Sequence, residues 1–134
     1  TNLSDTAQLK IKSPLPIIAD ENSINASDIP KIENVFDGIN IKLMKCGSLF
    51  EAIKMVKMAR ERDMQIMLGC MIESSVARTA AAHISPLVDY ADLDGNLLIN
   101  NDPYKGVTVD NGRLILPRTH GMGVSLIDND TSLR

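Results

Sequence analysis

The stretch DGINIKLMKCGS, Asp37–Ser48, decides the fold. Its first part predicts a short β-strand over residues 38–44, in which apolar residues alternate with Asn40, Lys42 and Met44. Successive side chains of a strand point to opposite faces, so Asn40 and Lys42 share one face. A parallel strand that is covered on both sides is apolar on both. A lysine at this position is therefore either solvated or retained for chemistry.

The same pattern of strand followed by helix recurs along the chain. Strands are predicted over residues 15–20, 38–44, 65–70 and 90–94, and helices over residues 1–12, 27–36, 48–63 and 75–88, with Ser27 and Ser48 as N-caps. Consecutive βα units with right-handed crossovers give a parallel sheet. After Gly95 the pattern changes, and the Asn111-Gly112 turn predicts a β-hairpin over residues 107–116.

The length of the chain leaves three architectures open. A complete (β/α)8 barrel needs roughly 250 residues, and this chain has 134. The alternatives are an open doubly wound sheet, a half-barrel that pairs with another half, and a piece of a longer protein. An open sheet normally carries a phosphate-binding loop, and the sequence contains no G-x-G-x-x-G or P-loop motif.

Composition excludes several classes of partner. The formal charge of -3 argues against a nucleic-acid or anionic membrane surface, and aromatic residues make up only 3% of the chain. No apolar run reaches membrane-spanning length, and the N-terminus is too polar for a signal sequence. Cys46 and Cys70 stand in different contexts and form no metal-binding motif. We expect a cytoplasmic protein with reduced thiols that binds neither nucleic acid nor membrane.

Ionisable residues collect at the predicted strand ends: Asp20, Lys42, Glu73, and Asp92 with Asp94. Any one of them could be a solvated residue at a loop junction, but four consecutive strand ends indicate an active-site rim. Asp92 and Asp94 are two apart on a predicted strand, and two carboxylates on one face predict a site for a cation or an ammonium group. The alternative for Asp94 is an Asx-turn with Gly95.

Four motifs together resemble the enolase superfamily: PIIADEN at 16–22, INIKLMKCG at 39–47, GCMIESS at 69–75 and YADLDG at 90–95. The similarity is greatest to its muconate-lactonizing subgroup and, within it, to dipeptide epimerases of the L-Ala-D/L-Glu type. The resemblance implies an α/β fold in which four consecutive βα units form the C-terminal half of a (β/α)8-type barrel. Residues 1–96 would be that half-barrel. Residues 97–134 would be an extension, carrying the β-hairpin, that packs toward a capping domain.

The resemblance also implies a role for each motif residue. Asp20 matches a ligand of an essential Mg²⁺, and Lys42 matches an acid/base lysine, with Asn40 beside it in support. The substrate would be contacted by the backbone of Ile72, the carboxylate of Glu73, and Asp92 and Asp94, which would receive its α-ammonium group.

The implied reaction is removal and return of the proton alpha to the carboxylate of a dipeptide or related compound, through an enediolate. Epimerisation needs a base on each face, and the second base, two more metal ligands and the capping domain have no counterpart in this sequence. We therefore expect the isolated chain to be inactive and to pair with the missing half or with a second copy. The alternatives are a muconate-type cycloisomerase, an acylamino-acid racemase, or a non-catalytic half-barrel that assembles with itself.

Overall fold

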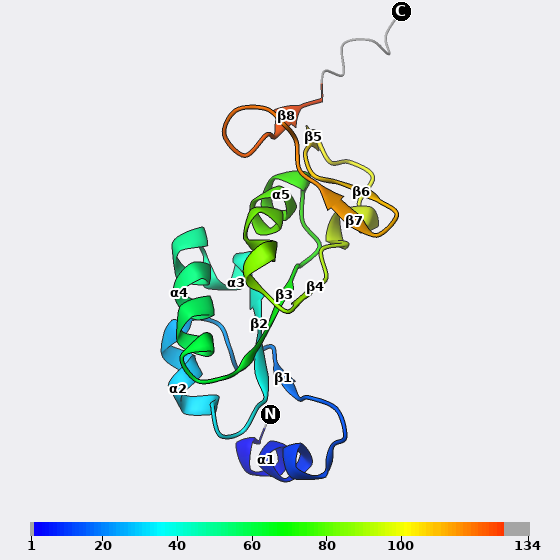
Figure 1. Ribbon diagram of the computed structural model, residues 1–134. Coiled ribbons are helices and arrows are strands. Elements are labelled where there is room, and N and C mark those ends of the chain that lie inside the picture. Colours follow the sequence, from blue (N-terminus) through cyan, green and yellow to red (C-terminus); the bar gives the residue numbers. More distant parts are fainter. Residues whose placement is uncertain (1, 128–134) are drawn as a thin grey trace, which may run out of the picture.

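A parallel sheet of four strands forms the centre of the computed structural model, which describes residues 2–127. Strands β1 (Ile18–Ala19), β2 (Gly38–Lys42), β3 (Gln65–Gly69) and β4 (Tyr90–Ala91) lie in chain order (Figure 1). All three pairings are parallel, and Lys42 is paired with Gly69. The α/β class and the four parallel strands are confirmed. The two outer strands are shorter than predicted.

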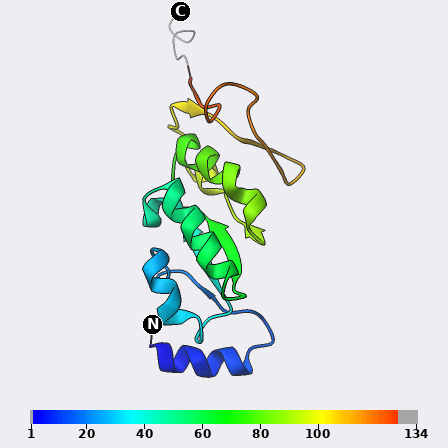
Figure 2. The ribbon, with the colours of Figure 1, turned by 60° about the vertical axis from the view of Figure 1, so that its left-hand side comes forward.

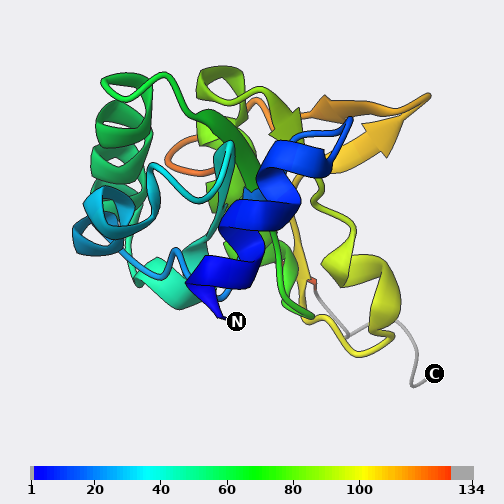
Figure 3. The same cartoon turned by 90° about the horizontal axis from the view of Figure 1, so that it is seen from below.

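Helices cover one side of the central strands. The helices are α1 (Leu3–Lys12), α2 (Ile29–Ile32), α3 (Leu43–Cys46), α4 (Leu49–Arg60) and α5 (Ser75–Ile84), with 3₁₀ turns η1 (Ala26–Asp28), η2 (Ser85–Leu87) and η3 (Gly95–Leu98). Seen from below, α2 and α4 lie on the same side of the sheet (Figure 3). Helices α4 and α5 run side by side (Figure 2). None of the helices within residues 2–127 has the length and apolar character needed to cross a bilayer.

Two local features differ from the sequence prediction. Asn25, not Ser27, caps the turn before α2, because its side chain accepts the Ser27 amide while Asp28 accepts the Asn25 amide. Residues 43–46, predicted as strand end and loop, form the short helix α3, which Gly47 ends with a φ of 83°. Strand β2 therefore stops at Lys42, which places this lysine at its carboxyl end.

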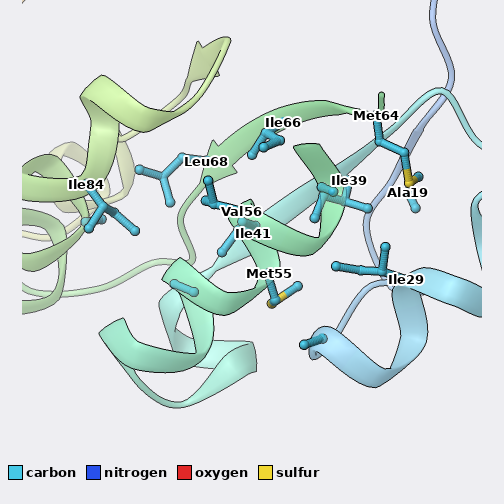
Figure 4. Packing of buried hydrophobic residues seen from close by; sticks show 14 of the residues in the cluster. Ala19, Ile29, Ile39, Ile41, Met55, Val56, Met64, Ile66, Leu68 and Ile84 are labelled. Atoms are coloured by element: carbon cyan, nitrogen blue, oxygen red, sulfur yellow. The ribbon is translucent and has the colours of Figure 1, made fainter. Parts of the chain in front are cut away.

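The core lies between the sheet and α4. Ile39 and Ile41 of β2 and Ile66 and Leu68 of β3 are fully buried, and they point toward Met55 of α4 (Figure 4). Burying an aliphatic side chain contributes roughly 1.5–3 kcal/mol. On α4 the buried face includes Met55, whereas Ile53 is 45% exposed.

Helix α1 and strand β8 (Ser125–Leu126) lie at opposite ends of the molecule (Figures 1 and 2). Helix α1 is attached at the lower end, where Lys10 Nζ donates to Phe36 O at 2.9 Å and lies 3.4 Å from Asp37 Oδ1. The predicted hairpin is confirmed as β6 (Thr108–Asp110) and β7 (Arg113–Ile115). Asn111 and Gly112 have φ values of 47° and 78°, as a tight hairpin turn requires.

The C-terminal extension is attached to α5. Strand β5 (Tyr104–Lys105) pairs with β8 (Ser125–Leu126) in a small antiparallel sheet. The Ser75 amide, at the start of α5, donates to Asp102 Oδ2 at 2.6 Å. One turn later, Thr79 Oγ1 accepts the Val107 amide at 2.9 Å. Residues 128–134, the end of the predicted extension, lie outside the described residues.

Candidate active site

Asp20 and two lysines meet at the carboxyl ends of β1 and β2. Lys42 Nζ lies 2.8 Å from Asp20 Oδ2. Lys45, from α3, contacts the other carboxylate oxygen and also donates to the main-chain oxygen of Asp20 at 2.7 Å. Each lysine side chain is 17% exposed and that of Asp20 is 31% exposed. Lys42 is therefore not a solvated strand residue but half of an ion pair at the sheet edge.

The pair shifts the pKa values of both partners. Burial raises the pKa of Asp20, but hydrogen bonds from Lys42 and Lys45 outweigh it, so the pKa of this carboxyl lies below its ordinary value. The hydrogen bond with Asp20 raises the pKa of Lys42 above its ordinary value, against the opposing effect of burial. Lys42 is therefore held in its charged form by Asp20 in this arrangement.

Asn40 lies beside the pair, as the sequence predicted. Its side chain is buried, and Nδ2 makes a long contact of 3.4 Å with Asp20 Oδ2. Its Oδ1 is buried without a hydrogen-bond partner among residues 2–127. Gly69 provides the space, because a Cβ there would lie 2.6 Å from Asn40 Oδ1. The amide therefore directs its nitrogen toward Asp20 and its oxygen toward Gly69.

Two residues at this site were not predicted from the sequence. Lys45 reaches Asp20 only because α3 turns the chain back after β2. Ser23 is buried and donates toward Ala19 O at 2.9 Å and Asp20 O at 3.1 Å, which fixes the turn after β1. The only signal for Lys45 in the sequence is its position three residues after Lys42. Nothing in the sequence indicates the role of Ser23.

The donor set suits part of a magnesium site. Mg²⁺ prefers carboxylate oxygens and takes near-octahedral coordination. Asp20 supplies such an oxygen, whereas Asn40 turns its nitrogen Nδ2 toward Asp20. Within residues 2–127, no three carboxylate, histidine or cysteine side chains gather as a metal site. Asp20 therefore fits as one ligand of a site whose other ligands lie elsewhere.

A second group lies at the ends of β3 and β4. Glu73 is buried, its Oε2 has no hydrogen-bond partner among the described residues, and burial raises the pKa of this carboxyl. Its neighbour Ile72 is 69% exposed. Burial and the nearby carboxylates also raise the pKa of Cys70, which disfavours the reactive thiolate form.

Asp92 and Asp94 are exposed on the same edge of the sheet. Strand β4 ends at Ala91, so the predicted alternation along a strand does not extend to either aspartate. The Asp92 amide donates to Leu68 O at 2.9 Å. Asp94 precedes η3, and its side chain makes no capping hydrogen bond, so the Asx-turn alternative is not observed. Its Oδ1 instead lies 3.8 Å from Cys70 Sγ, which accepts the Gly95 amide at 3.3 Å.

The chain matches a described family over nearly its whole length. A family profile described as "Enolase C-terminal domain-like" covers residues 1–130. The L-Ala-D/L-Glu epimerase of Bacteroides thetaiotaomicron is 50% identical over 93% of this chain and 33% of its own length. The L-Ala-D/L-amino acid epimerase of Pedosphaera parvula is 45% identical over 85% of this chain and 33% of its own.

Solved structures share the fold. A substrate-liganded L-Ala-D/L-Glu epimerase from Bacillus subtilis superposes with a TM-score of 0.85 at 29% identity, over 92% of this chain and 36% of that one. The dipeptide epimerase of Cytophaga hutchinsonii, complexed with Mg and D-Ala-L-Val, gives 0.85 at 27% identity, over 96% and 37%. The chain thus spans about a third of the length of the curated relatives that it matches.

Proposed function

Because the chain belongs to the enolase C-terminal domain-like family, we propose that it is the C-terminal part of a Mg²⁺-dependent dipeptide epimerase. The observation that carries the proposal is the Lys42 ammonium 2.8 Å from the Asp20 carboxylate, at the edge where parallel strands end. Relatives of 45–50% identity are named dipeptide epimerases. A base beside a cation-binding carboxylate is what abstraction of a proton alpha to a carboxylate requires.

Lys42 is the proposed base on one face of the α-carbon. Asp20 is the proposed ligand of the cation, which would neutralise the negative charge that develops on the substrate's carboxylate. An Asp20 that binds a cation is no longer the partner that holds Lys42 charged. Without that partner, the pKa of Lys42 would fall toward the range in which the amine accepts a proton. Asn40 and Lys45 keep the Asp20 side chain at the edge of the sheet.

Asp92 and Asp94 are the proposed acceptors of the α-ammonium group of the dipeptide. Both carboxylates are exposed on the edge that also carries Lys42, so a substrate can lie between the two groups. Glu73 and the backbone of Ile72 follow β3, the strand between them, and are proposed to contact the substrate. Opposite charges at the two ends orient a dipeptide with its carboxylate at the cation and its ammonium at the aspartates.

One base and one metal ligand do not complete the site. We propose that residues 1–96 are the C-terminal half of a (β/α)8 barrel and residues 97–134 an extension toward a capping domain. The first half-barrel would supply the second base and the remaining ligands, and the capping domain would select the substrate. The relatives' additional length provides room for both. By itself the 134-residue chain is expected to lack epimerase activity.

The test of Lys42 is deuterium incorporation at the α-carbon of L-Ala-L-Glu and L-Ala-D-Glu in ²H₂O, with the full-length enzyme. Each base serves one face, so Lys42→Ala should abolish exchange from one epimer while the second base still exchanges the other. Lys57→Ala is the matched control, since this lysine is 79% exposed on α4. Unimpaired epimerisation by Lys42→Ala would refute the assignment of the base.

The aspartate pair decides between the epimerase and its alternatives. A cycloisomerase or an acylamino-acid racemase has no α-ammonium group to bind. Asp92→Asn should therefore raise the KM for L-Ala-L-Glu by about ten-fold or more, as loss of a charged hydrogen bond does. Unchanged kinetics of Asp92→Asn on the dipeptide, together with a turnover of N-acetylglutamate that is faster than that of the dipeptide, would favour the racemase.

A further inference from the structure

Arg78 is a buried cation on α5 that the site described above leaves without a role. It is 3% exposed. Within residues 2–127, the guanidinium forms no ion pair with a carboxylate. Burial lowers the pKa of Arg78, although a guanidinium keeps its charge in proteins. The charge of Asp94 favours the charged guanidinium, but from beyond ion-pair distance. A buried charge without a direct ion pair is costly, and an apolar side chain would pack here at lower cost.

Two main-chain oxygens are the partners of Arg78. Its Nε donates to Leu93 O at 2.5 Å, and its Nη1 donates to Val107 O at 3.2 Å. Leu93 stands between Asp92 and Asp94, and its own side chain is buried. Val107 belongs to the C-terminal extension. The guanidinium of Arg78 therefore joins residues Asp92–Asp94, which we call the aspartate segment, to the extension.

The contact with Leu93 O fixes the part of the aspartate segment that other bonds leave free. The Asp92 amide is held by Leu68 O at 2.9 Å, and the Gly95 amide is held by Cys70 Sγ at 3.3 Å. The peptide unit between Leu93 and Asp94 lies between these two anchors. Its carbonyl accepts from Arg78. Rotation of that peptide would redirect the Asp94 side chain, because the backbone dihedrals that flank a peptide unit set the direction of the next Cβ.

We propose that Arg78 is a positioning residue for the ammonium site: it locks the Leu93–Asp94 peptide so that Asp92 and Asp94 present their carboxylates together. This inference rests on the proposed function, since it concerns the affinity of that same site. Arg78 does not touch the substrate. It acts through the backbone, and its second bond to Val107 O ties the geometry of the aspartates to the presence of the extension.

The first test separates ammonium recognition from general damage, with the full-length enzyme. The probes are L-Ala-L-Glu and N-propionyl-L-glutamate, which lacks only the amino group. Arg78→Met should raise the KM for the dipeptide by about ten-fold, the effect of a lost charge-assisted hydrogen bond. It should leave kcat and the inhibition constant of N-propionyl-L-glutamate within about two-fold, because the reacting carbon lies away from the ammonium group. Arg78→Lys, whose ammonium can donate to one of the two carbonyls, should give a KM for the dipeptide between those of the wild type and Arg78→Met.

Thr79→Val is the matched control. Thr79 neighbours Arg78 on α5, and its Oγ1 accepts the Val107 amide, but among the described residues it has no hydrogen bond with Leu93. This variant should weaken the extension without changing the ratio between the two probes. Equal losses on both probes with Arg78→Met, or the same selective rise in KM with Thr79→Val, would overturn the positioning role.

The second test does not depend on activity. Amide hydrogen exchange in the 134-residue chain should show about ten-fold faster exchange of the Asp92 and Gly95 amides in Arg78→Met, because the segment between them is released. Thr79→Val should accelerate hydrogen exchange at the Val107 amide and leave the exchange rates of the Asp92 and Gly95 amides unchanged. If the full-length wild type does not epimerise dipeptides, the proposed function fails, and the exchange rates still decide the role of Arg78. Unchanged exchange rates of the Asp92 and Gly95 amides in Arg78→Met would refute the positioning role of Arg78.

Discussion

Replacing Gly95 by alanine should damage the fold at the point where the loop after β3 meets the aspartate segment. A Cβ at Gly95 would lie 1.9 Å from Met71 O and 3.1 Å from Cys70 Sγ. Ordinary contact begins at 3.4 Å, so the Met71 carbonyl must retreat by about 1.5 Å. Main chain moves less readily than a side chain, and overpacking of this kind costs roughly 1–3 kcal/mol.

We expect the upper end of that range, because backbone meets backbone here. With a urea m value of about 1.5–2 kcal/mol/M, a loss of about 3 kcal/mol lowers the unfolding midpoint of Gly95→Ala by about 1.5–2 M. Gly112→Ala is the control. Gly112 has a φ of 78° and nothing within 4 Å of an added Cβ, so it carries only the left-handed backbone penalty of about 1 kcal/mol. A Gly95→Ala midpoint at or above that of Gly112→Ala would refute the close approach of Met71.

Three other predictions concern stability. Asn25→Ala should lower the free energy of unfolding by about 1 kcal/mol, whereas Ser27→Ala should change it by less than about 0.5 kcal/mol, both by urea denaturation. The lowered pKa of Asp20 gives stability that is present above its unfolded value of 3.8 and is lost as the pH falls through the folded value. The difference in melting temperature between wild type and Asp20→Asn should therefore shrink on acidification below that point, and an unchanged difference would contradict it. The same substitution should lower the pKa of Lys42, as followed by NMR titration, since Asp20 raises it. Leu68→Ala should cost about 2–5 kcal/mol, because the side chain is fully buried between sheet and helix.

The parts of the fold set by local patterns were predictable from sequence. The strand β2 and the Asn111-Gly112 turn depend on neighbouring residues, and both are confirmed, although β2 ends at Lys42 and not at Met44. The predicted rim placed Asp20 and Lys42 at the same edge, because adjacent parallel strands end there, but the ion pair between them was not predicted. Their roles, like those of the other site residues, stay predictions.

Features that depend on distant partners were not predictable. Arg78 stands in an alanine-rich helix, and its two acceptors lie 15 and 29 residues away in the chain. The Asn25 cap is different, because Asp28 stands three residues after Asn25 as a capping box requires, so this local pattern in the sequence favours Asn25 over Ser27. The ends of the outer strands depend on where pairing with β2 and β3 stops, which the sequence of either strand alone does not specify.

The attachment of the C-terminal extension to the first turns of α5 has a consequence for how the chain opens. Asp102 binds the Ser75 amide, and Thr79 binds the Val107 amide, so the two segments share their hydrogen bonds. Segments linked in this way open together as one cooperative unit. The last βα unit and the extension would then share one opening free energy, distinct from that of β1 and β2. Any event that detaches the extension would loosen the helix that supports the end of β4, and the four-stranded sheet would begin to open from its C-terminal side.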